Sequence, residues 1–295
     1  KTRKNIRSKL KKHSSTHSSL ISLHRFYCNA TGFLHVLPNY YIIGGQKCGT
    51  GSLYTYLLQH PNVQPAISKE PSYFDRYYDR GLNWYKICFP FGFHKTYYNK
   101  IKKQKFVTGE ASVRYLDHPF TPKRLKKITP NAKFIILLRN PIDRAYSQHT
   151  RVSGTGRDPL SFEEAIEKEE ERTKPEFKKM EENEMYWSGD YFRFSYLSRG
   201  IYVDKLERWF SVFPKEQFLI IQSEEFFKDT SNVYREVLQF LDLSNWEPKE
   251  YVQYKKREYK QPKMNSETRK KLVEYFKPHN ERLYEFLGRR FDWDE

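Results

Sequence analysis

The distribution of apolar positions predicts a chain in which strands and helices alternate. Continuous apolar runs mark strands at 40–43, 133–138 and 218–221. These runs lack a period of two, so both faces of each strand are expected to be buried, as in a parallel sheet. Apolar residues at helical spacing predict helices at 53–58, 202–213, 233–241 and 266–287. The pattern indicates an α/β fold with a mainly parallel central sheet and flanking helices.

Two of the predicted strands lead into segments that suit an anion. The first is followed by a helix that begins after the glycine-rich run Gly44-Gly45-Gln46-Lys47-Cys48-Gly49-Thr50-Gly51-Ser52. Glycines allow backbone N–H groups to close around a phosphate, and the helix N-terminus adds partial positive charge. The strand at 133–138 is followed by Arg139, by Asn140 as an N-cap and by Pro141 as the first helical residue.

The glycine-rich run is not a Walker A loop. That motif requires a lysine directly after its second glycine, where this chain has Thr50, and Lys47 lies in mid-loop instead. A Walker B carboxylate at a strand end is also missing, because Leu138 is followed by Arg139. An arginine at that place attracts phosphate and repels Mg²⁺. The chemistry indicated is the metal-free handling of a phosphorylated nucleotide.

The charge of the chain predicts an anionic partner. Its 295 residues include 53 Lys and Arg against 36 Asp and Glu, a formal net charge of +17. A nucleic acid, a sulfated or carboxylated glycan, a nucleotide and an acidic membrane all satisfy this excess. Eight of the basic residues and no acidic residue fall within residues 1–25. No nucleic-acid-binding motif is present, so we expect no specific nucleic-acid partner.

Composition narrows the class of protein further. Hydrophobic residues make up 38% of the chain, which is enough to form a core. The three cysteines fit neither a disulfide framework nor a zinc site, and no apolar run is long enough for a transmembrane segment. The acidic stretch 161–184 predicts a solvated helix with i,i+4 ion pairs rather than a metal site. We expect a basic N-terminal extension at 1–37 and one domain at 38–295.

Two motifs in the expected order carry a specific resemblance. The segment IIGGQKCGTGSLYTYLLQHPNV resembles the 5′-phosphosulfate loop of sulfotransferases that use 3′-phosphoadenosine 5′-phosphosulfate (PAPS), and KFIILLRNPIDRAYSQH resembles their 3′-phosphate motif. Together with SRGIYVDKLERWF and ETRKKLVEYFKPHNERLYEFLGRRFDW, they resemble the heparan sulfate N- and 3-O-sulfotransferase branch and its microbial relatives over about residues 38–293. The resemblance implies a P-loop-like sulfotransferase fold, PAPS as co-substrate, 3′,5′-ADP as product, and no metal.

The resemblance also implies roles for individual residues. Lys47 matches the lysine that stabilises the leaving oxygen, and Glu70 matches the general base that activates the acceptor. Arg139 and Ser147 match the pair that binds the 3′-phosphate. The residues implied to contact the 5′-phosphate follow Lys47 in the loop, and they are Cys48, Gly49, Thr50, Gly51 and Ser52. Cys48 is expected as a small loop residue and not as a nucleophile.

The chain departs from that branch at several places. Ser72 stands where the branch often has histidine, and Ala111 lacks the cation of a Glu-Lys pair. The cysteine-linked loop before the last helix is replaced by the basic run 255–260. Candidate phosphate contacts in that run are Arg257 and Lys260, although a solvated charge run explains it equally well. For Arg199 we expect structural packing. The candidates for acceptor binding are Lys69, Ser72 and Asp75, and Lys69 could bind the cofactor instead.

Other functions remain open at this point. A P-loop-like nucleotide kinase and a non-enzymatic polyanion-binding protein are the alternatives to a sulfotransferase acting on a small-molecule or glycan acceptor. The acceptor and the oligomeric state are not fixed, and we expect residues 76–105 and 151–195 to shape the acceptor cleft because loops vary most. The low cysteine count and the lack of an anchor favour the cytosol over the Golgi lumen.

Overall fold

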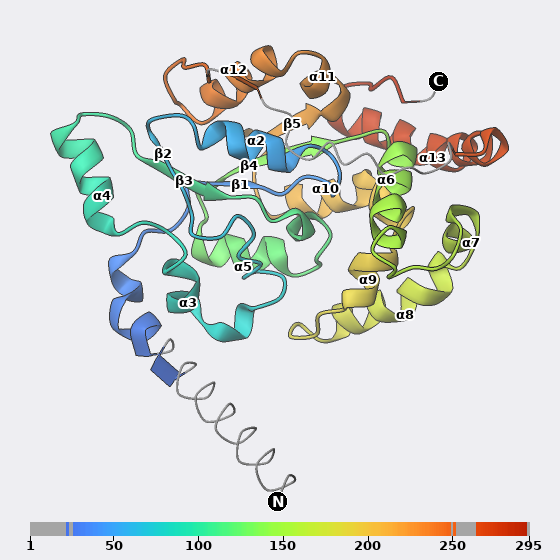
Figure 1. Cartoon of the computed structure of the whole chain (residues 1–295), viewed down its shortest axis with the longest axis horizontal. Helices are drawn as coiled ribbons and strands as arrows, with labels where there is room; N and C mark the ends of the chain where they lie inside the picture. Colours follow the sequence, from blue (N-terminus) through green and yellow to red (C-terminus); the bar gives the residue numbers. More distant parts are fainter. Residues whose placement is uncertain (1–21, 24–25, 249, 252–263, 294–295) are drawn as a thin grey trace, which may run out of the picture.

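The computed structural model describes residues 22–23, 26–248, 250–251 and 264–293. The described part contains one five-stranded sheet in the order β2-β3-β1-β4-β5 (Figure 1), and every neighbouring pair is parallel. The strands are β1 (Tyr40–Ile42), β2 (Val63–Gln64), β3 (Val107–Glu110), β4 (Lys133–Leu138) and β5 (Phe218–Gln222). The predicted α/β fold with a parallel central sheet is confirmed.

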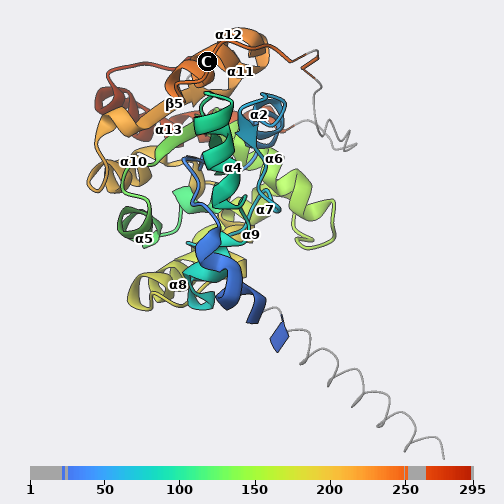
Figure 2. The same cartoon turned by 90° about the vertical axis from the view of Figure 1, so that its left-hand side faces the viewer.

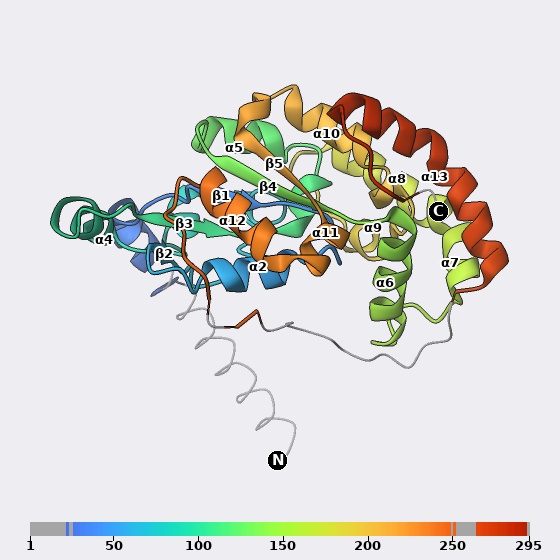
Figure 3. The ribbon, with the colours of Figure 1, turned by 90° about the horizontal axis from the view of Figure 1, so that it is seen from above.

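Two hydrophobic cores lie on opposite faces of the sheet, because successive residues of a strand point to opposite sides. Tyr41 and Ile136 belong to one core, and their neighbours Tyr40 and Ile135 belong to the other. The first core is covered by α3 (Leu82–Lys86), α5 (Thr121–Ile128), α10 (Tyr202–Phe210) and α13 (Ser266–Leu287). The second is covered by α2 (Thr50–Leu57), α11 (Ser223–Lys228) and α12 (Thr230–Phe240). Figure 3 shows α10 and α12 on opposite sides of the strands.

Further helices lie at the two ends of the molecule in Figure 1. Beyond one edge of the sheet is α4 (Gly92–Thr96), which continues as the π-helical turn η3 (Tyr97–Ile101). At the other end are α6 (Pro141–Ser153), α7 (Phe162–Glu167), α8 (Glu169–Glu182) and α9 (Gly189–Phe194). Short 3₁₀ turns connect the elements, namely η1 (Gly32–Leu34), η2 (Tyr78–Arg80), η4 (Val113–Leu116), η5 (Ser198–Gly200) and η6 (Lys215–Gln217). No helix in the described ranges is long and apolar enough to cross a bilayer.

The structure differs from the sequence prediction in two respects. Strands β2 and β3 were not predicted because they are short and carry polar residues. The acidic stretch 161–184 forms two helices, which meet at Lys168. Exposed ion pairs such as Lys174–Glu170 at 2.6 Å confirm the predicted solvated face. Glu169, however, is buried, and its carboxylate accepts hydrogen bonds from the backbone N–H groups of residues 197 and 198.

Candidate active site

The glycine-rich loop leaves β1 at its carboxyl end and stays paired with β4. The backbone N–H of Ile43 donates to Ile135 O at 3.0 Å, and that of Gly45 donates to Leu137 O at 2.9 Å. A Cβ atom on Gly44 would lie 2.2 Å from the Leu137 nitrogen. Only glycine fits at this position, because any side chain would collide with the β4 backbone. The loop is therefore held directly against the sheet.

Two residues with positive φ turn the loop into α2. Lys47 has a φ of 74°, and Gly49, the N-cap of the helix, has a φ of 89°. Such a conformation is ordinary for glycine but costs a lysine about 1–2 kcal/mol, so the rest of the loop must hold Lys47 in place. The first turn of α2 contains no acidic residue. Its backbone N–H groups and partial positive charge suit a phosphate.

Lys69 adds a side-chain cation to this turn. A Cβ atom on Gly51 would lie 3.0 Å from Lys69 Nζ, so the ammonium group rests on the first turn of α2. The same nitrogen lies 3.5 Å from Glu70 Oε1. The backbone oxygen of Lys69 accepts a hydrogen bond from Ala111 N at 3.0 Å, which fixes the segment to the end of β3. Lys69, expected to bind the acceptor or the cofactor, thus lies between the glycine-rich loop and Glu70.

Arg139 approaches the loop from the end of β4. One guanidinium nitrogen, Nη1, donates to Lys47 O at 3.3 Å. Asn140 is the N-cap of α6, because its side-chain oxygen accepts from Ile142 N at 3.0 Å, and Pro141 begins the helix as predicted. Ser147 lies two turns further along α6 and is partly exposed, as Arg139 is. The structure thus brings the two predicted anion-binding segments together through Arg139.

Cys48 packs into the protein beneath the loop. Its side chain is fully buried, and the burial raises the pKa of the thiol to about 11. A thiol with that pKa stays protonated near neutral pH and is a poor nucleophile. Its backbone oxygen accepts a hydrogen bond from Ser223 Oγ at 2.9 Å, which ties the loop to the start of α11. This environment agrees with the expectation of a packed loop residue.

The segment that carries Glu70 is held by a buried cluster. Ser72 has a φ of 53° and lies buried, and its hydroxyl oxygen accepts from Arg114 Nη2 at 2.9 Å. Asp75 is buried as well, and its Oδ2 accepts from Arg114 Nε at 3.1 Å and from Trp187 Nε1 at 3.4 Å. Burial raises the pKa of Asp75, and the charge of Arg114 opposes that rise. Glu70 itself stays partly open, with 37% of its side chain exposed.

A second buried carboxyl group supports the same segment from below. Glu110, at the end of β3, is fully buried, and burial raises its pKa to about 8. Its oxygens accept from Tyr85 at 2.5 Å, from Ser112 at 2.5 Å and from Tyr115 at 3.3 Å. The Tyr115 hydroxyl in turn accepts from the backbone N–H of Tyr73 at 3.0 Å. Glu110 therefore positions the strained backbone that follows Glu70.

Arg199 is a further residue of the loop support. It is buried, and it pairs with Asp117 at 2.8 Å through Nη2. Its Nη1 donates to Gln46 Oε1 at 2.8 Å, in the middle of the glycine-rich loop. The expectation of a packing role for Arg199 is consistent with these contacts, but the sequence did not reveal Gln46 or Asp117 as its partners. The motif Ser198-Arg199-Gly200 was the available signal, and it lies far from both partners in the chain.

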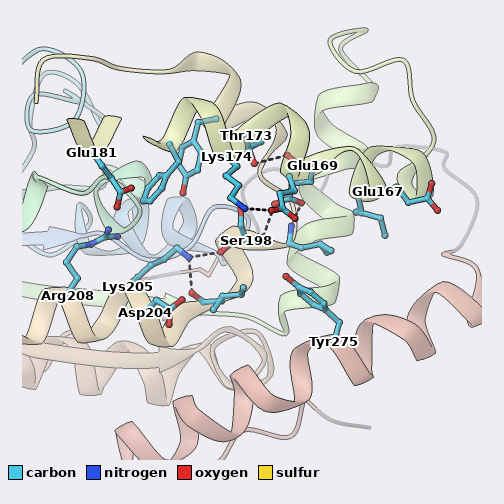
Figure 4. Close-up of a pocket in the computed structure, with 16 residues that line it drawn as sticks. Glu167, Glu169, Thr173, Lys174, Glu181, Ser198, Asp204, Lys205, Arg208 and Tyr275 are labelled. Atoms are coloured by element: carbon cyan, nitrogen blue, oxygen red, sulfur yellow. Dashed lines mark hydrogen bonds and ion pairs between the residues drawn. The ribbon is translucent and has the colours of Figure 1, made fainter. Parts of the chain in front are cut away.

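A cavity of 610 Å³ lies apart from these residues, among α7, α8, α10 and α13 (Figure 4). None of the predicted site residues lines it. Two buried charges on its wall hold the turn at 197–201, because Glu169 binds the turn's N–H groups and Lys205 Nζ donates to Ser198 O at 2.7 Å. The neighbouring Arg199 points away from this wall toward Gln46. The cavity and the predicted site are thus separate, with one turn between them.

Two predicted contacts cannot be placed. Arg257 and Lys260 lie outside the described residues. Within the ranges that the structure describes, no three His, Cys, Asp or Glu side chains gather as metal ligands.

Known proteins match most of the chain. The family model described as the sulfotransferase domain matches residues 37–282 of this chain. Membrane-associated sulfotransferase kil1 of Dictyostelium discoideum is 31% identical over an alignment of 328 positions, which covers 89% of this chain and 68% of that protein. Heparan sulfate glucosamine 3-O-sulfotransferase 3B1 of Homo sapiens is 28% identical over an alignment of 284 positions, which covers 88% of this chain and 65% of that protein. The chain therefore spans about two thirds of the length of these two relatives.

A solved sulfotransferase structure is similar to this chain in its fold. The sulfotransferase from Alicyclobacillus acidocaldarius is 30% identical to this chain, with a TM-score of 0.66 over 88% of this chain and all of that one. These matches support the predicted transferase over the nucleotide-kinase and polyanion-binding alternatives. The matched region includes both the glycine-rich loop and the segment of Glu70. On this evidence the chain belongs to the sulfotransferase domain family and is an enzyme that transfers sulfuryl groups.

Proposed function

We propose that this enzyme uses PAPS as its sulfuryl donor and a hydroxyl or amine group of a carbohydrate as its acceptor. The observation that carries the proposal is the contact between the glycine-rich loop and Arg139, which lies 3.3 Å from Lys47 O. This contact connects the loop at the N-terminus of α2 with the guanidinium group of Arg139, and both kinds of group bind phosphate. A donor with phosphates at its 5′ and 3′ positions matches this pair of sites.

The loop residues fit such a donor. The N–H groups of Gly49 to Gly51, with the hydroxyls of Thr50 and Ser52, hold the 5′-phosphate in this proposal, and Lys69 adds a cation to the same turn. Arg139 and Ser147 hold the 3′-phosphate. When bound, PAPS supplies the sulfuryl group and leaves as 3′,5′-ADP. Lys47 then lowers the barrier, because a cation beside the departing oxygen is worth most in the transition state.

Glu70 is the proposed general base. Its carboxylate is partly exposed and so accessible to an acceptor, whereas Glu110 and Asp75 are buried among hydrogen-bond donors. Lys69 Nζ lies 3.5 Å from Glu70 Oε1, so a cation adjoins the carboxylate that accepts the proton of the acceptor in this proposal. In-line attack needs the base on the acceptor side of the sulfuryl group. The position of Lys69 between Glu70 and α2 supports that arrangement.

The proposal of a carbohydrate acceptor has a different support. The human relative is named for 3-O-sulfation of heparan sulfate glucosamine, and the similarity covers 88% of this chain. In the segment that follows Glu70, Asp75 accepts from Trp187 Nε1 at 3.4 Å, and the guanidinium carbon of the exposed Arg76 lies 4.4 Å from the centroid of the Trp187 ring. Sugar rings stack on aromatic faces, and their hydroxyl groups bind cations and carboxylates. The position that is sulfated stays unassigned.

The test is transfer of ³⁵S from labelled PAPS to a panel of glycans. The panel contains heparan sulfate, its N-deacetylated form, chondroitin and an uncharged oligosaccharide, with a phenol as the non-carbohydrate control. We expect label in at least one glycan, and loss of the label in Lys47→Ala and in Glu70→Gln. Lys127→Ala, which removes an exposed lysine on α5, is the matched control and should retain activity. Label in the phenol alone would overturn the carbohydrate acceptor.

A further inference from the structure

An exposed apolar stripe runs along the helix formed by α4 and η3. Phe93, Tyr97 and Ile101 follow one another at intervals of four residues, so they share one face of the helix. Their exposed fractions are 63%, 43% and 69%. The helix projects from the end of the molecule opposite α7 and α13 (Figures 1 and 3). A contiguous exposed patch of this kind marks an interaction site more often than an isolated surface side chain does.

The same helix is strongly basic. Residues 91–106 contain five lysines and no acidic residue. Lys105 is paired with Asp242 at 2.8 Å, whereas the other four lysines are exposed and pair with no carboxylate among the described residues. These four are Lys95, Lys100, Lys102 and Lys103. The Lys102 ammonium nitrogen lies 5.5 Å from the centroid of the Tyr97 ring, so the charges adjoin the apolar stripe.

The described N-terminal segment extends this surface. Phe33 is 66% exposed and Leu34 is 47% exposed. The Leu34 oxygen lies 3.2 Å from the place of a Cβ atom on Gly92, and the rings of His35 and Phe91 are 3.9 Å apart. Figure 2 shows this segment directly below α4 on the face toward the viewer. We call residues 33–34 and 92–103 together the α4 surface.

We propose that the α4 surface docks on a lipid membrane with anionic headgroups. Lysines beside a stripe of Phe, Tyr and Ile are the features of an interfacial helix, whose apolar face enters the boundary between headgroups and acyl chains. The lysines attract the anionic headgroups. A soluble polyanion would satisfy the lysines but leave Phe93 and Ile101 in water. Residues 76–105 were expected to shape the acceptor cleft. We now assign the outer part of this range to membrane binding.

This inference is independent of the sulfuryl donor and acceptor. Docking would hold the enzyme at a surface and restrict the acceptors that it meets to those near that surface. The 21 residues that precede the described segment contain seven Lys and Arg and no acidic residue, so they match the same anionic surface by composition. Because they also attract anions, the experiment must report on the α4 surface itself.

The first readout is local. We expect Phe93→Trp to shift its fluorescence to shorter wavelengths when the full chain meets phosphatidylcholine vesicles containing phosphatidylserine. Brominated lipids should quench it, and vesicles of phosphatidylcholine alone should have little effect. Because position 93 is exposed, the substitution leaves the fold intact, which thermal unfolding checks. The native tryptophans are the background, so the unsubstituted chain is measured in parallel.

The second readout is binding by co-sedimentation with the same vesicles. The double variant Phe93→Ser, Ile101→Ser should lose the part of the vesicle binding that persists at high salt. Lys100→Ala with Lys102→Ala should weaken binding by about fivefold for each lysine at low salt. The matched controls are Met185→Ala, which is exposed elsewhere, and Lys123→Ala with Lys127→Ala, which removes two charges on α5. Both controls should bind as the unsubstituted chain does.

Two results would overturn the proposal. One is an unchanged fluorescence of Phe93→Trp on anionic vesicles, which would show that the α4 surface does not enter the membrane. The other is vesicle binding by the double variant Phe93→Ser, Ile101→Ser that equals the binding of the unsubstituted chain at every salt concentration. Binding to soluble heparin that depends on Lys100 and Lys102 but not on Phe93, together with either result, would identify a polyanion site instead.

Discussion

The two halves of the predicted active site are held together in different ways. The glycine-rich loop is fixed mainly by backbone contacts, such as Gly45 N to Leu137 O at 2.9 Å, between elements that the sheet already aligns. The Glu70 segment is fixed by side chains from distant parts of the chain, including Arg114 and Trp187 on Asp75. Backbone anchoring leaves little room for change. Side-chain anchoring allows the acceptor half to vary while the donor half stays the same.

Replacing the proposed base has the largest expected effect in this comparison. Glu70→Gln removes the proton acceptor and should lower the rate of sulfuryl transfer by about 10²–10⁴-fold. Affinity for 3′,5′-ADP should stay the same, because the donor half keeps its backbone anchors. Single-turnover transfer and calorimetry measure the two quantities. A transfer rate within a few-fold of the unsubstituted enzyme would exclude Glu70 as the base.

Breaking the anchor of Gln46 tests the donor half. Arg199→Met removes the 2.8 Å ion pair of buried Asp117 and leaves it, among the described residues, with the longer ion pair to Lys205 at 3.9 Å. Breaking a buried ion pair costs about 3–5 kcal/mol, so the free energy of unfolding should fall by that amount. Denaturant titration measures it. The affinity for 3′,5′-ADP should fall as well. If the variant loses stability but binds 3′,5′-ADP normally, the hydrogen bond from Arg199 to Gln46 does not contribute to nucleotide binding.

Measured over a single pH unit, the smallest expected effect concerns the pH dependence of stability in the acceptor half. Because burial raises the pKa of Glu110 to about 8, the folded chain keeps a proton that the unfolded chain releases near 4.5. This contribution to stability is complete below pH 4.5 and is lost as the pH rises to about 8. Its slope is at most about 1.4 kcal/mol per pH unit.

The variant Glu110→Gln carries an amide in place of the carboxyl group, so it has no proton to release in this pH range. Its free energy of unfolding should therefore fall less steeply than that of the unsubstituted chain between pH 4.5 and about pH 8. Urea titrations across that range measure the difference between the two curves, so that contributions from other groups cancel. Parallel curves would mean that Glu110 is ionised in the folded protein.

The same contrast explains what could be predicted from the sequence. The loop, Arg139 and the cap at Asn140 were predictable, because each lies within a few residues of a strong apolar strand. The neighbours of Ser72 were not, because the pairing of Arg114 with Asp75 joins segments that no local pattern connects. Strand β3 was missed because Val107–Glu110 mixes a glycine and a glutamate with few apolar residues. The choice between acceptor and cofactor stayed open for Lys69, since sequence spacing does not show that it folds over Gly51.

We propose that the glycine-rich loop and Arg139 form one site for a nucleotide phosphorylated at its 3′ and 5′ positions. Titration calorimetry with 3′,5′-ADP, 5′-ADP and Mg·ATP, for the unsubstituted chain and for Arg139→Ala, tests it directly. We predict that 3′,5′-ADP binds about tenfold or more tightly than 5′-ADP, because a charge-assisted contact adds about 1.5–3 kcal/mol, and that Arg139→Ala removes this preference. Equal affinity for 3′,5′-ADP and 5′-ADP, or tighter binding of Mg·ATP, would exclude a 3′-phosphate site at Arg139.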